Sequence, residues 1–479
     1  MLFNSLHFLL FFPVVVLLFF SLKDRSRIYW LIAASCYFYM AFVPAYILIL
    51  FFLILLDYAA GLMIARSQAP TRHLWLVLSI VGNVTMLGFY KYFNFLDQNL
   101  VALAQWIGFD YTGSQMNIIL PIGLSFHTFQ SMSYVFEVYR GRQPAERDLL
   151  VYSLYVLFFP QMVAGPIERP QNLLVQLHHT RPFDHERAVS GLVTMAIGFF
   201  KKLVIADRFA IVVNTVYSNP ATHSSTDLAI ASYCFAFQIY CDFAGYSDIA
   251  IGAARIMGYD LMTNFERPYA ARSISDFWKR WHISLSSWFR DYLYIPLGGN
   301  RVSRLVWYRN LMLVFMVSGL WHGANWTFVC WGALHGLYLV LANWTESLRA
   351  RIRSLSGIES MPVVKGVLQI VITFHLVLVG WVFFRASSVS EAVTILGRMI
   401  GGGGPAAPHD LGLTTFDLLI GVGAVAILEA YQWLTRQHAL PEWIRLQPTW
   451  IRWPVYYTLV SLVILLGKFS SQEFIYFQF

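Results

Sequence analysis

Two histidines attract attention because each follows a tryptophan and each could take part in proton transfer. His282 closes the stretch 277–282, which reads FWKRWH, and His322 follows Trp321 forty positions later. His322 also comes after an apolar run, 311–317, of the kind that enters a membrane. An imidazole titrates near pH 6.5, which suits a general base at neutral pH. An ionisable group at membrane depth is costly, so its presence suggests a function. We take His322 as the first catalytic candidate.

Each histidine also has a plainer interpretation. His322 could serve only as a hydrogen-bonding group between two helices, and His282 could be an interfacial residue that faces water. Cationic neighbours would tend to keep the imidazole of His282 neutral, which suits a hydrogen-bonding partner for a base or a substrate. His335 follows His322 by thirteen positions and is expected to be structural. His127 and His375 also lie in apolar stretches, and composition does not eliminate them.

The segment between the two histidines is basic. Residues 266–310 contain eight Lys or Arg and three Asp or Glu. This excess predicts a cytoplasmic position for the segment, including the loop 298–309, because cytoplasmic loops of membrane proteins are rich in Lys and Arg. The same charges could contact anionic lipids or hold the phosphates of a nucleotide-bearing donor. The phosphate-binding interpretation gains weight only because the two histidines flank the basic cluster. Its candidate cations are Lys279, Arg280 and Arg290.

The rest of the chain must position these residues inside a membrane. Of its 479 residues, 57% are hydrophobic and 13% are charged, whereas soluble domains carry about 25% charged residues. The apolar runs predict an all-α, polytopic bundle with about ten to twelve spans. The net charge of +8 agrees with basic cytoplasmic loops, and nothing indicates a nucleic-acid partner. The expected spans include 46–64, 74–90, 228–257, 311–330, 334–341 and 364–384.

Two stretches are expected to depart from regular spanning helices. Pro121 and Gly123 interrupt the apolar segment 117–138, and 164–170 reads AGPIERP, which cannot continue a helix. Broken backbone at membrane depth must be buried in protein or line a cavity. The segment 275–294 predicts one amphipathic, interfacial or re-entrant helix, whose apolar face would carry Phe277, Trp281, Leu285 and Trp288.

Other reactive side chains point to no metal site. The four cysteines lie in apolar stretches without metal-ligand spacing, so we expect small buried residues and neither zinc nor a structural disulfide. Asp242 and Asp248 could pair with Arg255, which we favour. With Glu168 they could instead form the proton path of a transporter or flippase for a lipid-linked sugar. That alternative needs no acyl donor.

Taken together, the motifs resemble a known family, the membrane-bound O-acyltransferases. The match is closest to the bacterial branch that serves alginate, peptidoglycan and cellulose acetylation and teichoic-acid D-alanylation. It spans essentially the whole chain. The motifs that carry it are MLFNS at 1–5, MVAGPIERP at 162–170, DFAGYSD at 242–248, FWKRWHISL at 277–285, WHG at 321–323 and EFIYF at 473–477. Ala244 stands where a serine is expected.

The resemblance implies a fold and a site. It implies one integral-membrane domain over 1–479, with a catalytic section at 266–345, folded as a helical bundle around a central funnel with re-entrant or interfacial helices. His322 corresponds to the family's invariant histidine and would act as general base. His282 stands where the family has Asn, Asp or His, and would orient the donor or polarise its carbonyl. Lys279, Arg280, Arg290 and Trp321 would help to bind the donor.

The resemblance also implies a cellular setting. The enzyme would be a multi-pass protein of a bacterial inner membrane, in contact with membrane lipids. It would bind no cofactor but would use acetyl-CoA, or another acyl thioester, as co-substrate from the cytoplasmic side. The acetyl group would pass to an exopolysaccharide, through a periplasmic SGNH-type acetyltransferase that works with polysaccharide secretion proteins, or directly.

Overall fold

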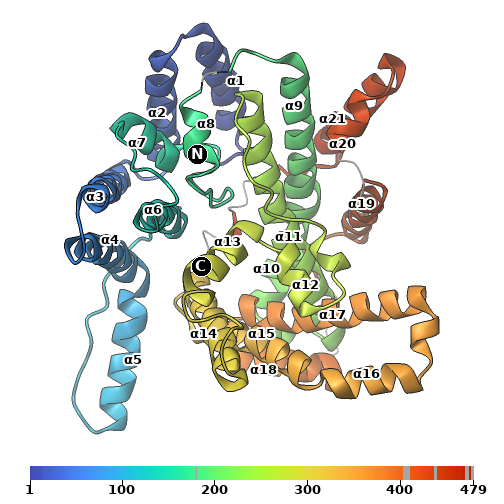
Figure 1. Cartoon of the computed structure of the whole chain (residues 1–479). Coiled ribbons are helices and arrows are strands. Elements are labelled where there is room, and N and C mark those ends of the chain that lie inside the picture. The colour runs from blue at the N-terminus through green and yellow to red at the C-terminus, as the bar shows by residue number, and fades with distance from the viewer. Residues whose placement is uncertain (180, 403–409, 436–439, 470–473, 476–479) are drawn as a thin grey trace. The chain divides into compact units, whose positions relative to one another are not determined.

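The computed structural model describes residues 1–479 except 180, 403–409, 436–439, 470–473 and 476–479. The described residues form helices joined by loops and turns, and none of them lies in a β-strand (Figure 1). The expected all-α class is therefore confirmed. Contacts divide the chain into two compact units, Met1–Met195 with Tyr246–Met262, and Ala196–Gly245 with Thr263–Phe479. The single domain over 1–479 stays a prediction.

The first unit contains the N-terminal helices. They are α1 (Leu6–Ser21), α2 (Arg25–Met40), α3 (Ile47–Arg66), α4 (Thr71–Leu87), α5 (Phe93–Trp106), α6 (Leu124–Tyr139), α7 (Leu149–Leu157), α8 (Leu173–Leu177) and most of α9 (His185–Phe199). The long helix α11 (Ser225–Ile256) contributes its C-terminal part to this unit and its N-terminal part to the second.

The second unit contains the remaining helices. They are α10 (Asp207–Ser218), α12 (Ile274–Arg280), α13 (Ile283–Phe289), α14 (Arg304–His322), α15 (Trp326–Trp344), α16 (Glu346–Leu355), α17 (Pro362–Arg385), α18 (Val389–Gly401), α19 (Thr415–Leu434), α20 (Leu440–Arg445) and α21 (Thr449–Leu466). π-Helical turns follow α9 at Phe200–Ala206 and α13 at Arg290–Tyr294.

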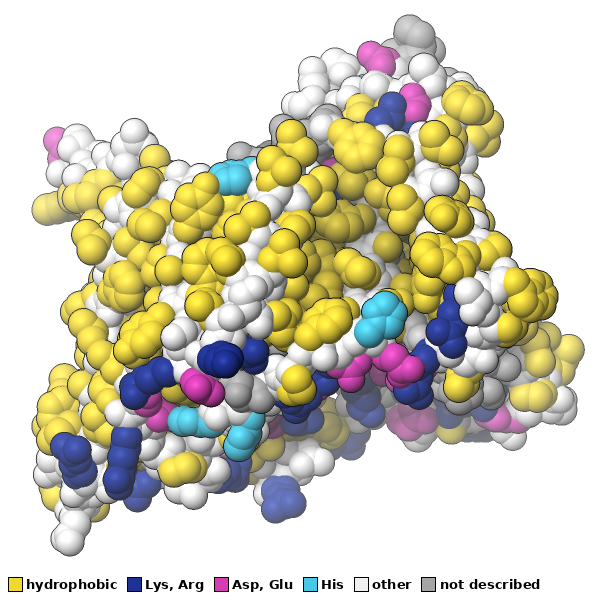
Figure 2. Space-filling view, turned by 90° about the horizontal axis from the view of Figure 1, so that it is seen from above, with side chains coloured by type: hydrophobic (Ala, Val, Ile, Leu, Met, Phe, Trp, Pro, Cys, Tyr) yellow, Lys and Arg dark blue, Asp and Glu magenta, His cyan; other side chains and the backbone are white. Residues whose placement is uncertain are grey.

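Seven helical segments of the described chain are long and apolar enough to cross a membrane. They are Pro44–Arg66, Thr71–Trp106, His185–Ser218, Ser225–Ile256, Pro362–Arg385, Thr415–Leu434 and Thr449–Leu466. Leu6–Ser21 is a shorter apolar helix. Large hydrophobic side chains cover much of the molecular surface (Figure 2), which is typical of lipid-facing helices. The protein is a multi-pass membrane protein, as expected, although several predicted spans correspond to shorter or more polar helices.

The expected breaks in the first unit are present. Residues 110–121 are not helical, and α6 begins only after Gly123, whose φ of 76° lies in the left-handed region. A side chain at Gly123 would also bring a Cβ within 2.8 Å of the carbonyl oxygen of Met162. The irregular stretch that contains AGPIERP is almost wholly buried. Broken backbone is therefore enclosed by protein, as membrane depth requires.

The core of the second unit is built from tryptophans. Trp281, Trp331 and Trp381 are among the largest fully buried side chains of the protein. The ring centroids of Trp281 and Trp381 lie 4.9 Å apart, and those of Trp331 and Trp381 lie 6.1 Å apart. Aromatic pairs at these separations stabilise beyond their buried area. This cluster joins α15 and α17 to the short segment between α12 and α13.

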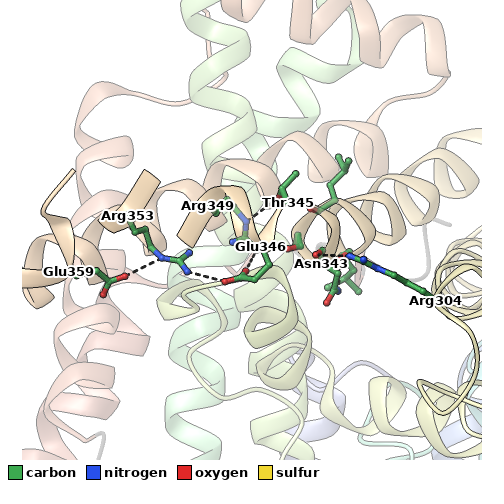
Figure 3. A network of polar contacts seen from close by, with 10 residues as sticks. Arg304, Asn343, Thr345, Glu346, Arg349, Arg353 and Glu359 are labelled. Atoms are coloured by element: carbon green, nitrogen blue, oxygen red, sulfur yellow. Dashed lines mark hydrogen bonds and ion pairs between the residues drawn. The ribbon is translucent and has the colours of Figure 1, made fainter. Parts of the chain in front are cut away.

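A network of charged side chains connects α16 to the 3-10 turn Ile358–Ser360 that precedes α17 (Figure 3). Glu346 accepts hydrogen bonds from Arg349 and Arg353, and Arg353 also reaches Glu359, with a nitrogen–oxygen distance of 3.2 Å. The hydrogen bond from Arg353 lowers the pKa of Glu346. Such exposed pairs contribute little to stability, so the network mainly orients the polar connection between two apolar helices.

Candidate active site

A tight helical hairpin positions His322. α14 ends at His322, Gly323 is extended, and Asn325 begins α15 by accepting a hydrogen bond from the backbone N–H of Thr327. The two helices pack so closely that a Cβ on Gly319 would lie 2.1 Å from the carbonyl oxygen of Phe328. The sequence predicted one spanning helix over 311–330. This prediction is wrong, because the chain reverses direction just after His322.

The side chain of His322 is enclosed by aromatic rings. It is 3% exposed. Its ring centroid lies 5.0 Å from that of Trp321, 5.0 Å from that of Trp331 and 5.3 Å from that of Phe384, in edge-to-face arrangements. Trp331 comes from α15 and Phe384 from α17. Three helices thus hold this imidazole in an apolar pocket, where little water competes with a proton transfer.

His282 interrupts what the sequence predicted as one helix. Its φ of 43° and ψ of 55° place it in the left-handed region, which costs a non-glycine residue about 1–2 kcal/mol. The predicted helix 275–294 is therefore α12, His282, α13 and a π-helical turn. The predicted apolar face, with Phe277, Trp281, Leu285 and Trp288, is buried. The prediction of one continuous helix is wrong, because the chain turns at His282 while this face is buried.

The backbone and side chain of Asn264 hold the turn in place. The carbonyl oxygen of Asn264 accepts from the N–H of Ile283 at 2.9 Å. Its side-chain Oδ1 accepts from the backbone N–H of Ser284 at 3.3 Å and from the hydroxyl of Ser284 at 2.9 Å. The same Oδ1 lies 3.1 Å from Nδ1 of His282. Because Oδ1 is an acceptor, Nδ1 carries the proton and Nε2 carries the lone pair.

Burial determines the charge of His282. The residue is fully buried, and the rings of Phe243 and Phe265 pack against its imidazole with centroid distances of 4.6 and 6.3 Å. Burial lowers the pKa of His282 from 6.5 to about 3. The imidazole is therefore neutral at pH 7, as expected, but the cause is desolvation and not the cationic neighbours. The interpretation as a water-facing residue is wrong.

The indole of Trp321 lies beside both histidines. Its ring centroid is 6.2 Å from that of His282 and 5.0 Å from that of His322. The two imidazoles, forty positions apart in sequence, therefore belong to one aromatic enclosure. Trp321 was predicted to help bind a donor. The structure places its ring near both catalytic candidates, and its role in donor binding stays a prediction.

The three candidate cations lie nearer the surface. Lys279 and Arg290 are exposed and Arg280 is half-buried. Arg280 pairs with Asp276 and Arg290 pairs with Asp291, each with a nitrogen–oxygen distance of 2.8 Å. No carboxylate of the described residues pairs with Lys279. Lys279 and Arg280 end α12, just before His282, and Arg290 begins the π-helical turn after α13.

Several residues of the enclosure had no sequence signal as site residues. Asn264 lies eighteen positions before His282, and Phe384 lies sixty-two positions after His322. Phe243 was visible only as part of the DFAGYSD motif. Residues that act by enclosing or orienting another side chain carry no distinctive spacing, so only the packing of distant segments identifies them.

The carboxylates of Asp242 and Glu168, which were candidates for a proton path, each have partners within the protein. Asp242 pairs with Lys202, with a nitrogen–oxygen distance of 2.6 Å. An ion pair was expected for Asp242, but the predicted partner, Arg255, is wrong. Glu168 accepts hydrogen bonds from the side chain of Asn172 and the backbone of Met262. These contacts do not favour a proton path. Asp242 also accepts from the backbone of Ile475 at 2.7 Å. Phe474 of the same motif is buried, with its ring centroid 5.6 Å from that of Phe243, and residues 473, 476 and 477 lie outside the described residues.

The third histidine of this region, His335, was expected to be structural, and its contacts agree with that expectation without testing it. His335 is fully buried on α15, and its Nδ1 accepts a hydrogen bond from the indole N–H of Trp278 at 3.3 Å. The aromatic rings of Phe277, Phe315 and Trp331 pack around it. The four cysteines are free.

Comparisons with known proteins identify the family. Residues 140–389, which include all six predicted site residues, match the family model described as MBOAT, membrane-bound O-acyltransferase family. The chain is 40% identical to a Pseudomonas aeruginosa protein named "Probable alginate O-acetylase AlgI", over 82% of this chain and 73% of that protein.

Two further relatives carry other names. A Helicobacter pylori peptidoglycan O-acetyltransferase is 36% identical, over 79% of this chain and 75% of that protein. A Bacillus subtilis teichoic acid D-alanyltransferase is 30% identical, over 56% of this chain and 69% of that protein. The family match covers more than half of the chain and the first relative most of it, so this chain belongs to the membrane-bound O-acyltransferase family and is an acyltransferase of that type.

Proposed function

We propose that this protein is an O-acetyltransferase that uses acetyl-CoA from the cytoplasm to acetylate an exopolysaccharide outside a bacterial inner membrane. The observation that carries the proposal is the enclosure in which Trp321 contacts both His282 and His322. The relatives named for alginate and peptidoglycan acetylation support acetyl as the acyl group and a polysaccharide as its destination.

In the proposed reaction His322 is the general base. Its imidazole removes the proton of the acceptor hydroxyl while the hydroxyl oxygen attacks the thioester carbonyl. The new carbon–oxygen bond forms, the carbon–sulfur bond breaks, and the protonated imidazole returns the proton to the leaving thiolate. A base should have a pKa near the working pH. Burial lowers the pKa of His282 to about 3, which argues against His282 as the base.

His282 is assigned to orientation. Because Nδ1–H donates to Asn264, Nε2 of the neutral ring can only accept a hydrogen bond. A hydrogen-bond acceptor cannot polarise a carbonyl group. Of the two roles that the family resemblance implies for His282, only the orientation of a substrate therefore fits this tautomer. Asn264 is the positioning residue that keeps the tautomer and the ring orientation.

Lys279 is the strongest candidate for the donor phosphates, because it forms no ion pair with a carboxylate of the described residues, whereas Asp276 pairs with Arg280. Arg280 and Arg290 would have to exchange their carboxylate partners for phosphate, which guanidinium groups do readily. The acetyl acceptor would be the hydroxyl of a periplasmic SGNH-type acetyltransferase or of the polysaccharide itself. In this proposal the protein works with polysaccharide secretion proteins and contacts membrane lipids, and no nucleic acid takes part.

The test is acetyl transfer in inverted membrane vesicles supplied with radiolabelled acetyl-CoA. Loss of a general base typically costs about 10²–10⁴ in rate, so we expect His322→Ala to abolish measurable transfer at normal abundance. His375→Ala is the matched control, because His375 is an exposed histidine of the same unit that contacts Tyr233. Wild-type transfer by the His322→Ala protein would overturn the proposal, and so would wild-type vesicles that never consume acetyl-CoA.

A further inference from the structure

We propose that the first unit binds a sodium ion at the carboxylate of Asp57. Asp57 lies near the middle of α3, within the membrane-crossing segment Pro44–Arg66, and its side chain is fully buried. No Lys, Arg or His among the described residues forms an ion pair with it. A lone charge at this depth is costly, so the position calls for a compensating cation.

Polar groups from three other helices gather around this carboxylate. The hydroxyl of Ser79 on α4 donates to Oδ1 of Asp57 at 2.5 Å, and the hydroxyl of Ser131 on α6 donates to Oδ2. The hydroxyl of Tyr152 on α7 lies 3.0 Å from Oγ of Ser131. Asn83, one turn after Ser79, donates from Nδ2 to both carboxylate oxygens at 3.0 and 2.9 Å. All the groups that contact the carboxylate are neutral, so the cluster keeps the single negative charge of Asp57.

The amide of Asn83 supplies a second, independent observation. Its Oδ1 is buried and has no hydrogen-bond partner in the part of the chain that the structure describes. Meanwhile its Nδ2 serves three acceptors, the two carboxylate oxygens and the carbonyl of Ser79, with only two hydrogens. A half-turn of the amide would place Oδ1 beside the carboxylate. The unsatisfied oxygen would then face the same point as the other oxygens and could ligate an ion.

The set of donor atoms determines the kind of ion. Carboxylate, hydroxyl and amide oxygens are hard ligands that suit hard cations. One formal negative charge balances a monovalent cation, and divalent ions normally recruit more carboxylates. The compact shell favours a small ion. With sodium bound, the hydroxyls of Ser79 and Ser131 would turn their lone pairs inward. Their hydrogens could bond backbone carbonyls of the preceding helical turn.

The experiment is thermal unfolding of the purified full-length protein in detergent, at fixed pH and fixed total salt. Sodium chloride replaces choline chloride stepwise, and intrinsic tryptophan fluorescence reports the midpoint Tm. A ligand that binds only the folded state raises Tm with its concentration. We expect the Tm of the wild-type protein to rise and saturate with sodium. Asp57→Asn keeps the side-chain shape without the charge and should show no rise.

A matched control separates the site from a general effect of buried carboxylates. Asp97 is a buried aspartate of the same unit, bonded to the hydroxyl of Tyr111 at 2.8 Å and the backbone of Ser114 at 2.9 Å. Asp97→Asn should keep the full sodium response. If Asp57→Asn does not fold, Ser131→Ala takes its place and should need more sodium for the same rise. Equal Tm of wild-type protein in sodium and choline overturns the proposal, as does a full response in Asp57→Asn or Ser131→Ala.

Discussion

The side-chain oxygen of Asn264 lies 3.1 Å from Nδ1 of His282 and also receives two hydrogen bonds from Ser284. This contact fixes which ring nitrogen carries the proton. It also holds His282 in a left-handed backbone conformation that the residue would not adopt by itself. The orientation of one catalytic candidate thus depends on a residue eighteen positions earlier in the chain.

The first prediction concerns Asn264. Asn264→Ala removes the acceptor and leaves Nδ1–H unsatisfied, which costs about 1–3 kcal/mol, so we expect a ten- to hundredfold loss of acetyl transfer at matched membrane abundance. Asn264→Asp keeps an oxygen acceptor and should restore much of the rate at pH 8. The new carboxylate would raise the pKa of His282, so the rate of this variant should decline towards pH 6.

This combination of results distinguishes positioning from a structural role. If Asn264 had a structural role alone, Asn264→Ala and Asn264→Asp would have similar membrane abundance. The pH dependence of their acetyl transfer rates would then match that of the wild-type protein. The assignment of Asn264 as a positioning residue is contradicted if Asn264→Ala transfers acetyl groups at the wild-type rate.

The second prediction separates the two histidines. His282→Asn should be milder than His282→Ala, because Asn still offers one donor group and one acceptor at similar reach. His322→Asn should be as damaging as His322→Ala, because an amide cannot take up a proton near pH 7. The measurement is the acetyl transfer rate of all four variants. If Asn is tolerated at 322 and not at 282, the roles of base and orienting residue are reversed.

The third prediction concerns pH. The pKa of His282 is about 3 in the folded protein and about 6.5 in an unfolded chain. Between these values the unfolded state binds more protons, so the contribution of the neutral imidazole to stability is complete above pH 6.5 and is lost as the pH falls towards 3. Activity at pH 6–8 should therefore not depend on titration of His282.

The measurement for this prediction compares pH–rate profiles. Wild-type protein and His282→Asn should give curves of the same shape between pH 6 and 8, displaced only in height. An inflection in the wild-type curve that is missing from the His282→Asn curve would show that His282 titrates in this range.

The fourth prediction concerns the donor. Lys279→Ala should raise the KM for acetyl-CoA and leave kcat nearly unchanged, because a phosphate contact remote from the thioester binds ground state and transition state alike. Arg349→Ala is the matched control, a surface cation of the same unit that is paired with Glu346. Equal KM values for wild-type protein and Lys279→Ala would remove Lys279 from the donor site.

The fifth prediction concerns topology. The loop 298–309 should face the cytoplasm because of its charge, and Ser303 within it is exposed. In a protein whose four native cysteines have been replaced, a cysteine at 303 should resist a membrane-impermeant thiol reagent in intact cells and react after permeabilisation. Ready labelling of intact cells would invert the orientation and move the donor site to the other face.

Much of the protein's class could be predicted from the sequence, because it depends on composition and on local spacing. Apolar runs and scarce charges predicted an all-helical membrane protein. The Trp-His pairs at 281–282 and 321–322 predicted the two imidazoles that the fold brings to one enclosure. Helix breakers predicted the breaks at Gly123 and at 164–170, since proline and glycine act on their own backbone.

Only the tertiary structure decided how the site is assembled. The segment 275–294 has the pattern of one helix, yet it turns at His282 because burial of Phe277, Trp281 and Trp288 outweighs the cost of a left-handed residue. Asn264 and Phe384 meet the histidines through long-range packing, and no local pattern encodes such contacts. Asp242 was expected to pair with Arg255 on its own helix, but it pairs with Lys202 because a buried carboxylate takes the cation that the fold brings within reach.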